Sequence, residues 1–368
     1  MVKHTKWKFM LVLTISLLLV SGCSSKYSKY TYKNYKELKK PGKETQLESM
    51  VVLKRDATNR IGDFEIIKNH LVLIDTQADE VIKIFDLKTH ELLKSFAKVG
   101  QGPSEFIQAS QIIPSKRDKS VFWVFDLSTN QLKKHNIDAV LANNFKPENI
   151  IHLKEENGFA VHFIILPDEK ILALGFYVNG RIDIFNFDGD IIRTIGKIPV
   201  KLRQKQFSTQ HSHGFDGTFI YEDNSKEIFV APMLGSVVEV YNLNGELLST
   251  YHGPDTFFPQ YDIVSAGEYF TMTYNKKSRF GYLDICYCAK TDKLFLLYSG
   301  KFFKEGRSSW SGTTVYVLNN AGTIIKQLTL DTAVCQMNIS DDGSILYGLT
   351  EENEIVSFEY NTKHGHGV

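Results

Sequence analysis

The segment from Leu71 to Phe106 carries the pattern that most constrains the fold. It reads LVLIDTQADEVIKIFDLKTHELLKSFAKVGQGPSEF. LVLID is a run of branched apolar residues followed by turn-forming TQAD, and VIKIFDL then alternates with period two. ELLKSF is a third strand, and the glycines and proline of Gly100–Pro103 require a crossover, because glycine weakens strands and proline lacks a donor. With the next strand, FIQASQII, the unit has the composition of a four-stranded propeller blade.

Variants of this unit recur to the C-terminus. The third strands of successive units end at Phe85, Ile137, Phe185, Tyr241, Val317 and Phe358. Such a near-period is the mark of a repeat architecture. Turns with D-G, N-G or A-G follow three of these strands, and their residues accept positive φ in tight hairpins. The sequence therefore predicts an all-β fold, a six-bladed β-propeller of four-stranded antiparallel blades.

The outer strands of the second and sixth blades depart from the repeat. In the second blade we expect the weak outer strand VLANNF (140–145), and the sixth blade ends one strand short. The isolated strand QLESMVVLK (46–54) can supply the missing strand. That closes the ring with an N-terminal strand and removes an exposed edge. We therefore expect one propeller domain over residues 45–368.

The N-terminus predicts an exported, lipid-anchored protein. Lysines precede an apolar run from Phe9 to Val20 that is too short to span a bilayer, and Leu19-Val20-Ser21-Gly22-Cys23 closes it. This closing segment resembles the lipobox of bacterial lipoproteins, in which the cysteine is acylated and becomes the mature N-terminus. We interpret residues 1–22 as the signal peptide and Cys23 as the lipidation site. The alternative is a plain signal peptide or an uncleaved anchor with an incidental cysteine.

Residues 23–44 read as a flexible, basic tether between the lipid and the domain. They are rich in lysine and tyrosine and lack apolar periodicity. Residues 1–44 hold ten lysines and two glutamates, a charge of +8, so a whole-chain charge of +1 leaves about −7 for the rest. A mildly acidic folded part argues against nucleic acid as a partner. The lysines could also lie against anionic headgroups.

The repeat unit and the lipobox together resemble a known family. LVLIDTQADEVIKIFD and VGQGPSEF are similar to the NHL-type repeat, and GQGPSEF (100–106) matches a G-x-G-P-x-E-[FY] segment. Over residues 45–360 the chain resembles the TolB-like six-bladed β-propeller lipoproteins common in Bacteroides-type bacteria. The glycine crossover is lost in blades four to six, where the chain departs from stricter NHL repeats. The resemblance implies the fold and a location in the cell envelope, and it brings no agreed catalytic residues.

Three long segments are predicted to lie on one face of the propeller. In a four-stranded blade, the loop between the second and third strands lies at the same end as the crossover to the next blade. Segments 197–213 and 252–280 are crossovers, and 299–312 is the second–third loop of blade five. Loops at the end of a scaffold commonly carry binding residues. The ligand-binding candidates are Arg203, His211, His213, Phe257, Phe258, Tyr261, Arg279, Phe302, Phe303, Arg307 and Trp310. Aromatic rings with arginines suit sugars or peptides, and the alternative is that the rings seal the blade ends.

Other polar residues have simpler interpretations. His211 and His213 could place two imidazoles on one side of a strand as a metal pair, but no third ligand is identifiable and exposed loop histidines are preferred. Glu105 is expected to cap backbone amides at the crossover, and Asp75 to cap a turn. Cys286 and Cys288 share one face of a strand and read as small core residues, with pairing to Cys335 as the alternative. No metal site and no cofactor are predicted.

The motifs of common enzymes are missing from the sequence: it has no G-x-S-x-G, H-E-x-x-H, P-loop or G-x-G-x-x-G. The first hypothesis is therefore a non-catalytic envelope lipoprotein of the outer membrane, periplasmic or surface-facing, that binds a glycan, a peptide or an envelope protein. The alternative is a metal-dependent propeller hydrolase or lyase with its site at the tunnel mouth, where calcium could be held. A structural role in an envelope complex is a third possibility.

Overall fold

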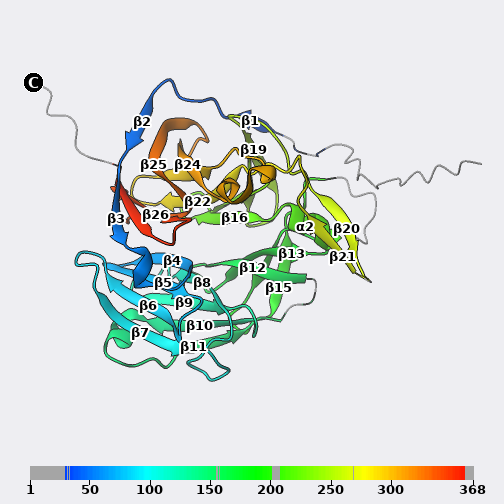
Figure 1. Cartoon of the computed structure of the whole chain (residues 1–368). Coiled ribbons are helices and arrows are strands. Elements are labelled where there is room, and N and C mark those ends of the chain that lie inside the picture. Colours follow the sequence, from blue (N-terminus) through cyan, green and yellow to red (C-terminus); the bar gives the residue numbers. More distant parts are fainter. Residues whose placement is uncertain are drawn as a thin grey trace, which may run out of the picture.

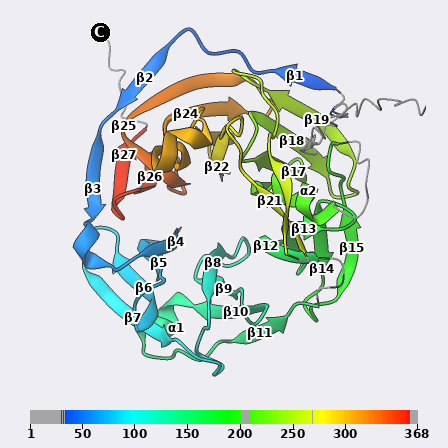
Figure 2. The ribbon, with the colours of Figure 1, turned by 45° about the vertical axis from the view of Figure 1, so that its right-hand side comes forward.

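Six blades of antiparallel strands form a ring around a central tunnel (Figures 1 and 2). This computed structural model describes residues 30, 32, 34–154, 156, 158–200, 208–267 and 269–360. The predicted signal peptide and Cys23 lie outside the described residues. No helix in the described ranges is long and apolar enough to cross a membrane. The fold is the predicted six-bladed β-propeller.

The first three blades each contain four strands in simple up-and-down order. Blade one consists of β4 (Ile61–Ile67), β5 (His70–Asp75), β6 (Glu80–Asp86) and β7 (Leu92–Lys98). Blade two consists of β8 (Ala109–Pro114), β9 (Val121–Asp126), β10 (Gln131–Asn136) and β11 (Asn149–His152). Blade three consists of β12 (Gly158–Ile165), β13 (Ile171–Tyr177), β14 (Ile182–Phe185) and β15 (Ile191–Ile195).

The last three blades follow the same order, but one strand is shared between two of them. Blade four consists of β16 (Gly217–Glu222), β17 (Glu227–Pro232), β18 (Val237–Asn242) and β19 (Leu247–His252). Blade five consists of β22 (Tyr282–Cys288), β23 (Lys293–Tyr298), β24 (Gly312–Asn319) and the first part of β25 (Ile324–Ile339). Blade six consists of the second part of β25, β26 (Ile345–Thr350), β27 (Ile355–Glu359) and β3 (Ser49–Leu53).

The N-terminal segment runs along the outer edges of three consecutive blades. β1 (Tyr35–Glu37) pairs in parallel with β19 of blade four, and β2 (Glu44–Leu47) pairs in parallel with β25 of blade five. β3 then pairs antiparallel with β27 and completes blade six (Figure 2). The prediction that an N-terminal strand closes the ring is confirmed.

Two expectations about this segment change in detail. The expected closing strand 46–54 is divided, because its first residues belong to β2 on blade five and only Ser49–Leu53 joins blade six. The part of the expected tether from residue 34 to 44 is not free, since β1 and the start of β2 are paired with blades. Exposed sheet edges accept a strand through backbone hydrogen bonds alone, so a segment without apolar periodicity can join them.

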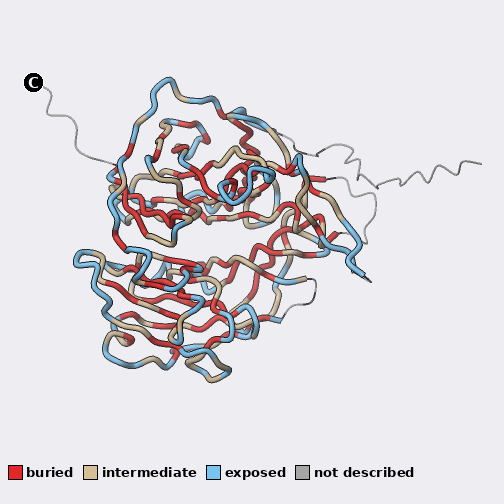
Figure 3. The backbone as a smooth tube through the Cα atoms, viewed as in Figure 1, coloured by how far each residue is buried: buried red, intermediate tan, exposed pale blue. Residues whose placement is uncertain are grey.

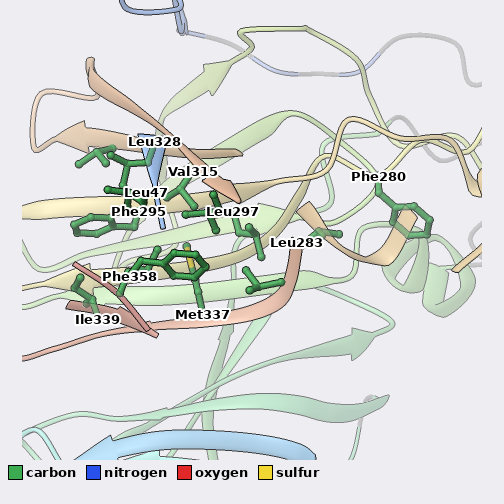
Figure 4. Packing of buried hydrophobic residues seen from close by; sticks show 14 of the residues in the cluster. Leu47, Phe280, Leu283, Phe295, Leu297, Val315, Leu328, Met337, Ile339 and Phe358 are labelled. Atoms are coloured by element: carbon green, nitrogen blue, oxygen red, sulfur yellow. The ribbon is translucent and has the colours of Figure 1, made fainter. Parts of the chain in front are cut away.

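Apolar side chains fill the junctions between neighbouring blades. Ile74 and Phe96 of blade one meet Phe122 of blade two, for example, and Phe229 of blade four meets Leu296 of blade five. Figure 4 shows the junction of blades five and six, where Phe295, Leu328, Met337 and Phe358 pack together with Leu47 of β2. Figure 3 shows that the buried stretches follow the strands and the exposed ones the turns. The inner strands, such as β5 and β9, therefore need apolar residues on both of their faces.

The crossover after blade one explains the glycines of GQGPSEF. The backbone N–H of Gly102 donates to Oε2 of Glu105 at 2.8 Å, which confirms the capping role predicted for Glu105. A Cβ atom at Gly100 would overlap this carboxylate, so the position needs glycine. The buried ammonium of Lys133 in blade two donates to the carbonyl oxygens of Gly102, at 3.4 Å, and Glu105. The motif thus joins blades one and two.

The outer part of blade two differs from the prediction. Residues 140–145 do not form a strand, because α1 (Ile137–Leu141) ends within this range and the outer strand is β11 instead. Asn136 caps α1, accepting the N–H groups of Asp138 and Ala139 at 3.0 and 3.1 Å. An N-cap asparagine favours a helix start. The turn-capping role of Asp75 is confirmed by a bond from the N–H of Gln77 at 3.4 Å, and the same carboxylate also accepts the N–H groups of Asn59 and Arg60 ahead of β4.

Candidate functional site

The three long segments meet at one end of the ring, as predicted. The described part of the first forms α2 (Ser208–Gly214), the second contains a hairpin of β20 (Asp262–Ala266) and β21 (Tyr269–Thr273), and the third contains η3 (Phe303–Trp310). The Gln210 amide of α2 donates to the carbonyl of Phe270 in β21 at 3.1 Å. Tyr274, directly after β21, lies 5.0 Å from the Phe303 ring of η3. The strand order of a propeller blade is therefore sufficient to predict from the sequence at which end of the ring these loops lie.

Arg279 is the centre of one group of candidates. Its guanidinium lies 4.4 Å from the centre of the Phe257 ring and 5.5 Å from that of Phe302. It also donates to the carbonyl of Gly300 at 2.7 Å and forms an ion pair with Asp255. Because its face and its donors are already engaged, Arg279 holds the second and third segments together.

The two histidines of α2 take separate roles. The segment is a helix, so the possible arrangement of two imidazoles on one side of a strand does not occur. His211 is buried rather than exposed, and its Nδ1 lies 3.0 Å from the Tyr261 hydroxyl. His213 instead contacts the ring of Phe176, 4.4 Å away. Burial lowers the pKa of both histidines, which favours neutral rings packed under the loops.

The remaining aromatic candidates divide between packing and exposure. Phe258 is covered by the N-terminal segment, since the Tyr30 ring stacks on it at 4.4 Å. Phe303 and Trp310 both contact Tyr274 yet remain partly exposed, and Arg307 is largely exposed. Arg203 lies outside the described residues. The face therefore keeps an exposed rim above rings that seal the blades.

A cavity of about 940 Å³ lies inside the ring and is lined by the first strands of all six blades. Small-molecule sites typically have volumes of about 300–1,000 Å³. The cavity extends to turns between first and second strands, such as those at Lys68, Lys116 and Asp341. In a propeller these turns lie at the end opposite the crossovers, so the cavity reaches the end away from the long loops.

Each blade contributes at least one polar side chain from its first strand to the cavity wall. We call one such residue from each blade the polar ring: Asp63, Gln111, His162, Thr218, Asp284 and Gln336. In five of the six blades a β-bulge immediately precedes the residue. A bulge adds one residue to a strand and redirects the side chain after it. A repeated backbone irregularity thus places polar groups around a shared cavity.

Several members of the ring also connect neighbouring blades. The N–H of Ile112 donates to Asp63 at 2.6 Å, and the N–H of Met337 donates to Asp284 at 2.8 Å. Gln111 accepts the N–H of Phe163 at 2.8 Å, and the amide of Gln336 donates to Asp63. By contrast, the Thr218 hydroxyl oxygen is buried without a hydrogen-bond partner among the described residues. Such an atom is costly unless something else binds it.

Burial changes the ionisation of the acidic groups in the cavity. It raises the pKa of Asp63 to about 6 and that of Asp284 to about 7. The pKa of Glu65, to which Asn338 donates, is raised well above its usual value by burial and then by the charge of Asp63. Burial also lowers the pKa of His162. A carboxyl with a pKa of about 7 is partly protonated at neutral pH, so Asp284 can donate as well as accept hydrogen bonds.

The turn between β8 and β9 crosses the far mouth of the cavity. Lys116 forms an ion pair with Asp223 of blade four at 2.7 Å, and Lys119 forms one with Asp341 of blade six. Between them, Arg117 lies 3.3 Å from Glu169 of blade three. A turn of blade two is thus tied to three other blades, and we call residues 115–119 the mouth strap.

The described residues offer little that resembles a metal centre. No group of three or more His, Cys, Asp or Glu side chains in the described ranges is arranged to hold a metal ion. Cys286, Cys288 and Cys335 are all free, and all three line the cavity. Burial raises the pKa of Cys286 well above its usual value and that of Cys335 to about 11, so their thiols are poor nucleophiles and ligands.

Sequence reasoning missed the polar ring. Its signal was a polar residue within each first strand, as in Gly62-Asp63 and Leu283-Asp284. The repeat is most regular in its third strands and glycine turns, and these carry no information about the first-strand positions. An alignment on the first strands would have put them in register.

Comparison with known proteins agrees with this geometry. A family model described as TolB-like 6-blade propeller-like matches residues 63–342. A structure of a DUF4221 family member from Bacteroides vulgatus has a TM-score of 0.52 at 11% identity, with 86% of this chain and 96% of that chain covered. A mitotic checkpoint complex chain has a TM-score of 0.44 at 9% identity, covering 82% and 75%. The Cps50 (Swd1) propeller of Myceliophteria thermophila has a TM-score of 0.45 at 8% identity, covering 83% and 97%. No curated protein matches the chain.

The class is a six-bladed β-propeller with a polar central cavity. The chain belongs to the TolB-like 6-blade propeller-like family. A propeller of this kind supports a binding or interaction module in general, because its fold presents loops and a tunnel on a rigid scaffold.

Proposed function

We propose that the protein is a lipid-anchored, non-catalytic binding module of the bacterial cell envelope. Its ligand is a small, hydroxyl-rich molecule such as a sugar or a short glycan, and it binds in the central cavity. The polar ring is the observation that carries this proposal. Anchoring rests on the lipobox that ends at Cys23. The protein belongs to the outer membrane, facing the periplasm or the surface.

The chemistry of the ring supports a neutral polyol. Amide and hydroxyl groups offer both donors and acceptors, and the Asp284 carboxyl, with a pKa raised to about 7, is partly protonated at neutral pH and can also do both. Sugar hydroxyls need alternating donors and acceptors of this kind. The Thr218 hydroxyl has no hydrogen-bond partner in the described chain and is therefore the group with most to gain from a ligand.

The ligand site can be tested with a panel of monosaccharides and short envelope glycans, first by thermal shift and then by calorimetry. Binding at 100 times Kd should stabilise the fold by about 2.7 kcal/mol. Thr218→Val should weaken binding of a positive probe about 2- to 10-fold, the value of one net hydrogen bond. Thr291→Val is the matched control, because its hydroxyl is also buried without a described partner but does not line the cavity. Equal effects of the two variants, or no positive probe, would reject the cavity as the site.

The anchor requires a separate test. The full-length chain made in a Gram-negative host should carry acyl groups on Cys23 by mass spectrometry and should partition into the detergent phase. Cys23→Ser should remain unacylated and leave that phase. Acylation elsewhere, or none in the wild type, would reject the anchor.

The alternative proposal is a metal-dependent hydrolase or lyase with its site at the tunnel mouth. Its support is limited to the raised pKa values of Asp63 and Asp284, since perturbed carboxyls are common at catalytic sites. Metal analysis with melting curves in the presence and absence of EDTA tests it. One bound calcium or zinc per chain, together with a lower Tm on chelation, would favour the enzyme.

A further inference from the structure

We propose that the central cavity selects a sugar that carries a methyl group, such as an N-acetylated amino sugar or a 6-deoxy sugar. Ile164 and Ile220, which both line the cavity, recognise this methyl group. The assignment rests on the sugar site proposed above and names the chemical class that this site prefers.

The residues two positions after the polar ring form a second layer of the cavity wall. Side chains two apart on a strand point to the same face. In chain order the residues of this second layer are Glu65, Ile113, Ile164, Ile220, Cys286 and Asn338, and all of them line the cavity. Because the first strands run from the polar ring toward the first–second turns at the far mouth, the second layer lies about 7 Å nearer to that mouth. One sugar ring can therefore contact both layers.

The second layer is apolar on one side of the cavity and polar on the other. Ile164 of blade three and Ile220 of blade four are neighbours in the ring and are both partly exposed, while Ile113 of blade two is buried. On the other side, the amide of Asn338 in blade six donates a hydrogen bond to Glu65 of blade one. In a ring of six blades, six and one lie opposite three and four. A bound ligand thus meets an apolar wall on one flank and a hydrogen-bonding wall on the other.

The two isoleucines leave part of their apolar surface open to the cavity. Ile164 packs against the junction of blades three and four, and Ile220 packs against the junction of blades four and five. Each remains partly exposed, and each lines the cavity, so the uncovered part of the side chain faces the ligand space. Removing such surface from water is favourable, and a methyl group covers it without requiring a hydrogen bond.

The charges of the cavity wall disfavour an anionic ligand at these two layers. The lysines among the described residues of the wall are Lys68, Lys116, Lys119 and Lys290, and all of them lie at first–second turns near the mouth. The polar ring and the second layer contain carboxyl groups but neither lysine nor arginine. A phosphate or carboxylate would therefore find no cation there. Sugar hydroxyls and an acetamido group can both donate and accept hydrogen bonds, which suits the polar wall.

The test compares matched sugars on the purified full-length protein by isothermal titration calorimetry. The pairs are glucose with N-acetylglucosamine and D-galactose with 6-deoxy-D-galactose, which separates the two sources of a methyl group. In at least one pair, the methyl-bearing sugar should bind about 3- to 10-fold more tightly than its parent, the effect of burying one methyl group. Ile164→Thr and Ile220→Thr should each lower that ratio about twofold or more, because threonine presents less apolar surface. Ile66→Thr is the matched control, since Ile66 is also partly exposed in the cavity wall but belongs to blade one.

The outcomes separate this proposal from the sugar site itself. Equal affinity within both pairs for the wild type overturns the methyl preference and leaves the sugar site standing, and this comparison is decisive even if a threonine variant fails to fold. A ratio that Ile66→Thr lowers as much as Ile164→Thr overturns the assignment to the isoleucine wall. Tighter binding of glucosamine than of N-acetylglucosamine would show that the carboxyl groups select an amine, and it would overturn the proposal as well. If none of these sugars binds, the sugar site fails and the methyl preference falls with it.

Discussion

The guanidinium of Arg181 and the carboxylate of Glu239 form an ion pair, with Nε and Oε2 2.9 Å apart and both side chains almost completely buried. Arg181 precedes β14 of blade three and Glu239 lies in β18 of blade four. The hydroxyls of Tyr241 and Tyr32 also donate to Glu239, at 2.9 and 3.1 Å. One carboxylate thus joins two blades to the N-terminal segment.

Glu239→Gln should destabilise the fold strongly. Removing one partner of a buried ion pair leaves an uncompensated charge and typically costs about 3–5 kcal/mol. Glu169→Gln is the control, since its pair with Arg117 is exposed and such pairs contribute about 0–1 kcal/mol. Urea unfolding measures both. A cost below about 1 kcal/mol for Glu239→Gln would show that the buried pair is not needed.

Closure of the ring should depend on one face of β3. Leu53 is 4% exposed and packs in the junction of blades six and one, whereas Val51 on the same strand is 47% exposed. Leu53→Ala should lower the free energy of unfolding by about 2–5 kcal/mol. Val51→Ala should change it by less than about 0.5 kcal/mol. Similar losses at both positions in denaturant titrations would contradict the packing of this strand.

The cavity carboxyls should make the protein less stable as pH rises. Because the folded pKa of Asp284 is about 7 and its unfolded value is near 4, the folded state binds more protons between these values. Its stabilising contribution is complete below about pH 4 and is lost as pH rises through 7. The Tm of the wild type minus that of Asp284→Asn should therefore fall between pH 5 and 8.

Asp342 provides the comparison for this pH dependence. Hydrogen bonds from Ser344 and Ser340 lower its pKa to about 2, so its contribution changes only at more acidic pH. The Tm difference between the wild type and Asp342→Asn should be flat from pH 5 to 8. A flat profile for Asp284→Asn as well would mean that the Asp284 carboxyl titrates normally.

The mouth strap should control access to the cavity thiols. Cys286 and Cys335 line the cavity, and their raised pKa values predict slow reaction with a small maleimide. Lys116→Ser with Lys119→Ser removes two ion pairs of the strap and should speed labelling several-fold, with a stability change of about 1 kcal/mol or less. Arg55→Ser, which breaks the exposed pair with Glu352, is the control. Labelling is measured by mass spectrometry, and an unchanged rate would show that the strap does not cover the mouth of the cavity.

The blades could be predicted from sequence because each strand carries its own apolar pattern. VIKIFDL and SVVEVYNL needed no distant information, and positive φ at Gly189, Gly245 and Gly322 agrees with the predicted turns. Pairing between distant strands through the backbone is harder to predict from the sequence. β1 and β2 join blades through main-chain bonds, with Leu47 as the one side chain of these two strands buried in the core, and α1 replaced a strand because Asn136 caps it.

The loop face could be predicted only in part, and the cavity not at all, for a physical reason. Blade topology fixed the end at which the long segments lie, but it could not tell which rings would be covered, and so Arg279 and His211 are packing residues in the structure. The polar ring depends on bulges such as the one between Ile61 and Asp63. A bulge leaves no regular signal in one strand, and six strands must be compared before its residue stands out.

The pairing of β3 with β27 has a consequence for biosynthesis. β3 leaves the ribosome long before β27, so a nascent chain contains the strand that closes the ring but not the strand with which it pairs. Premature termination anywhere before blade six leaves an open ring with two unpaired edges, which are prone to aggregation. The ring can close only in a chain that extends through β27, so fragments that lack β27 cannot form the closed propeller.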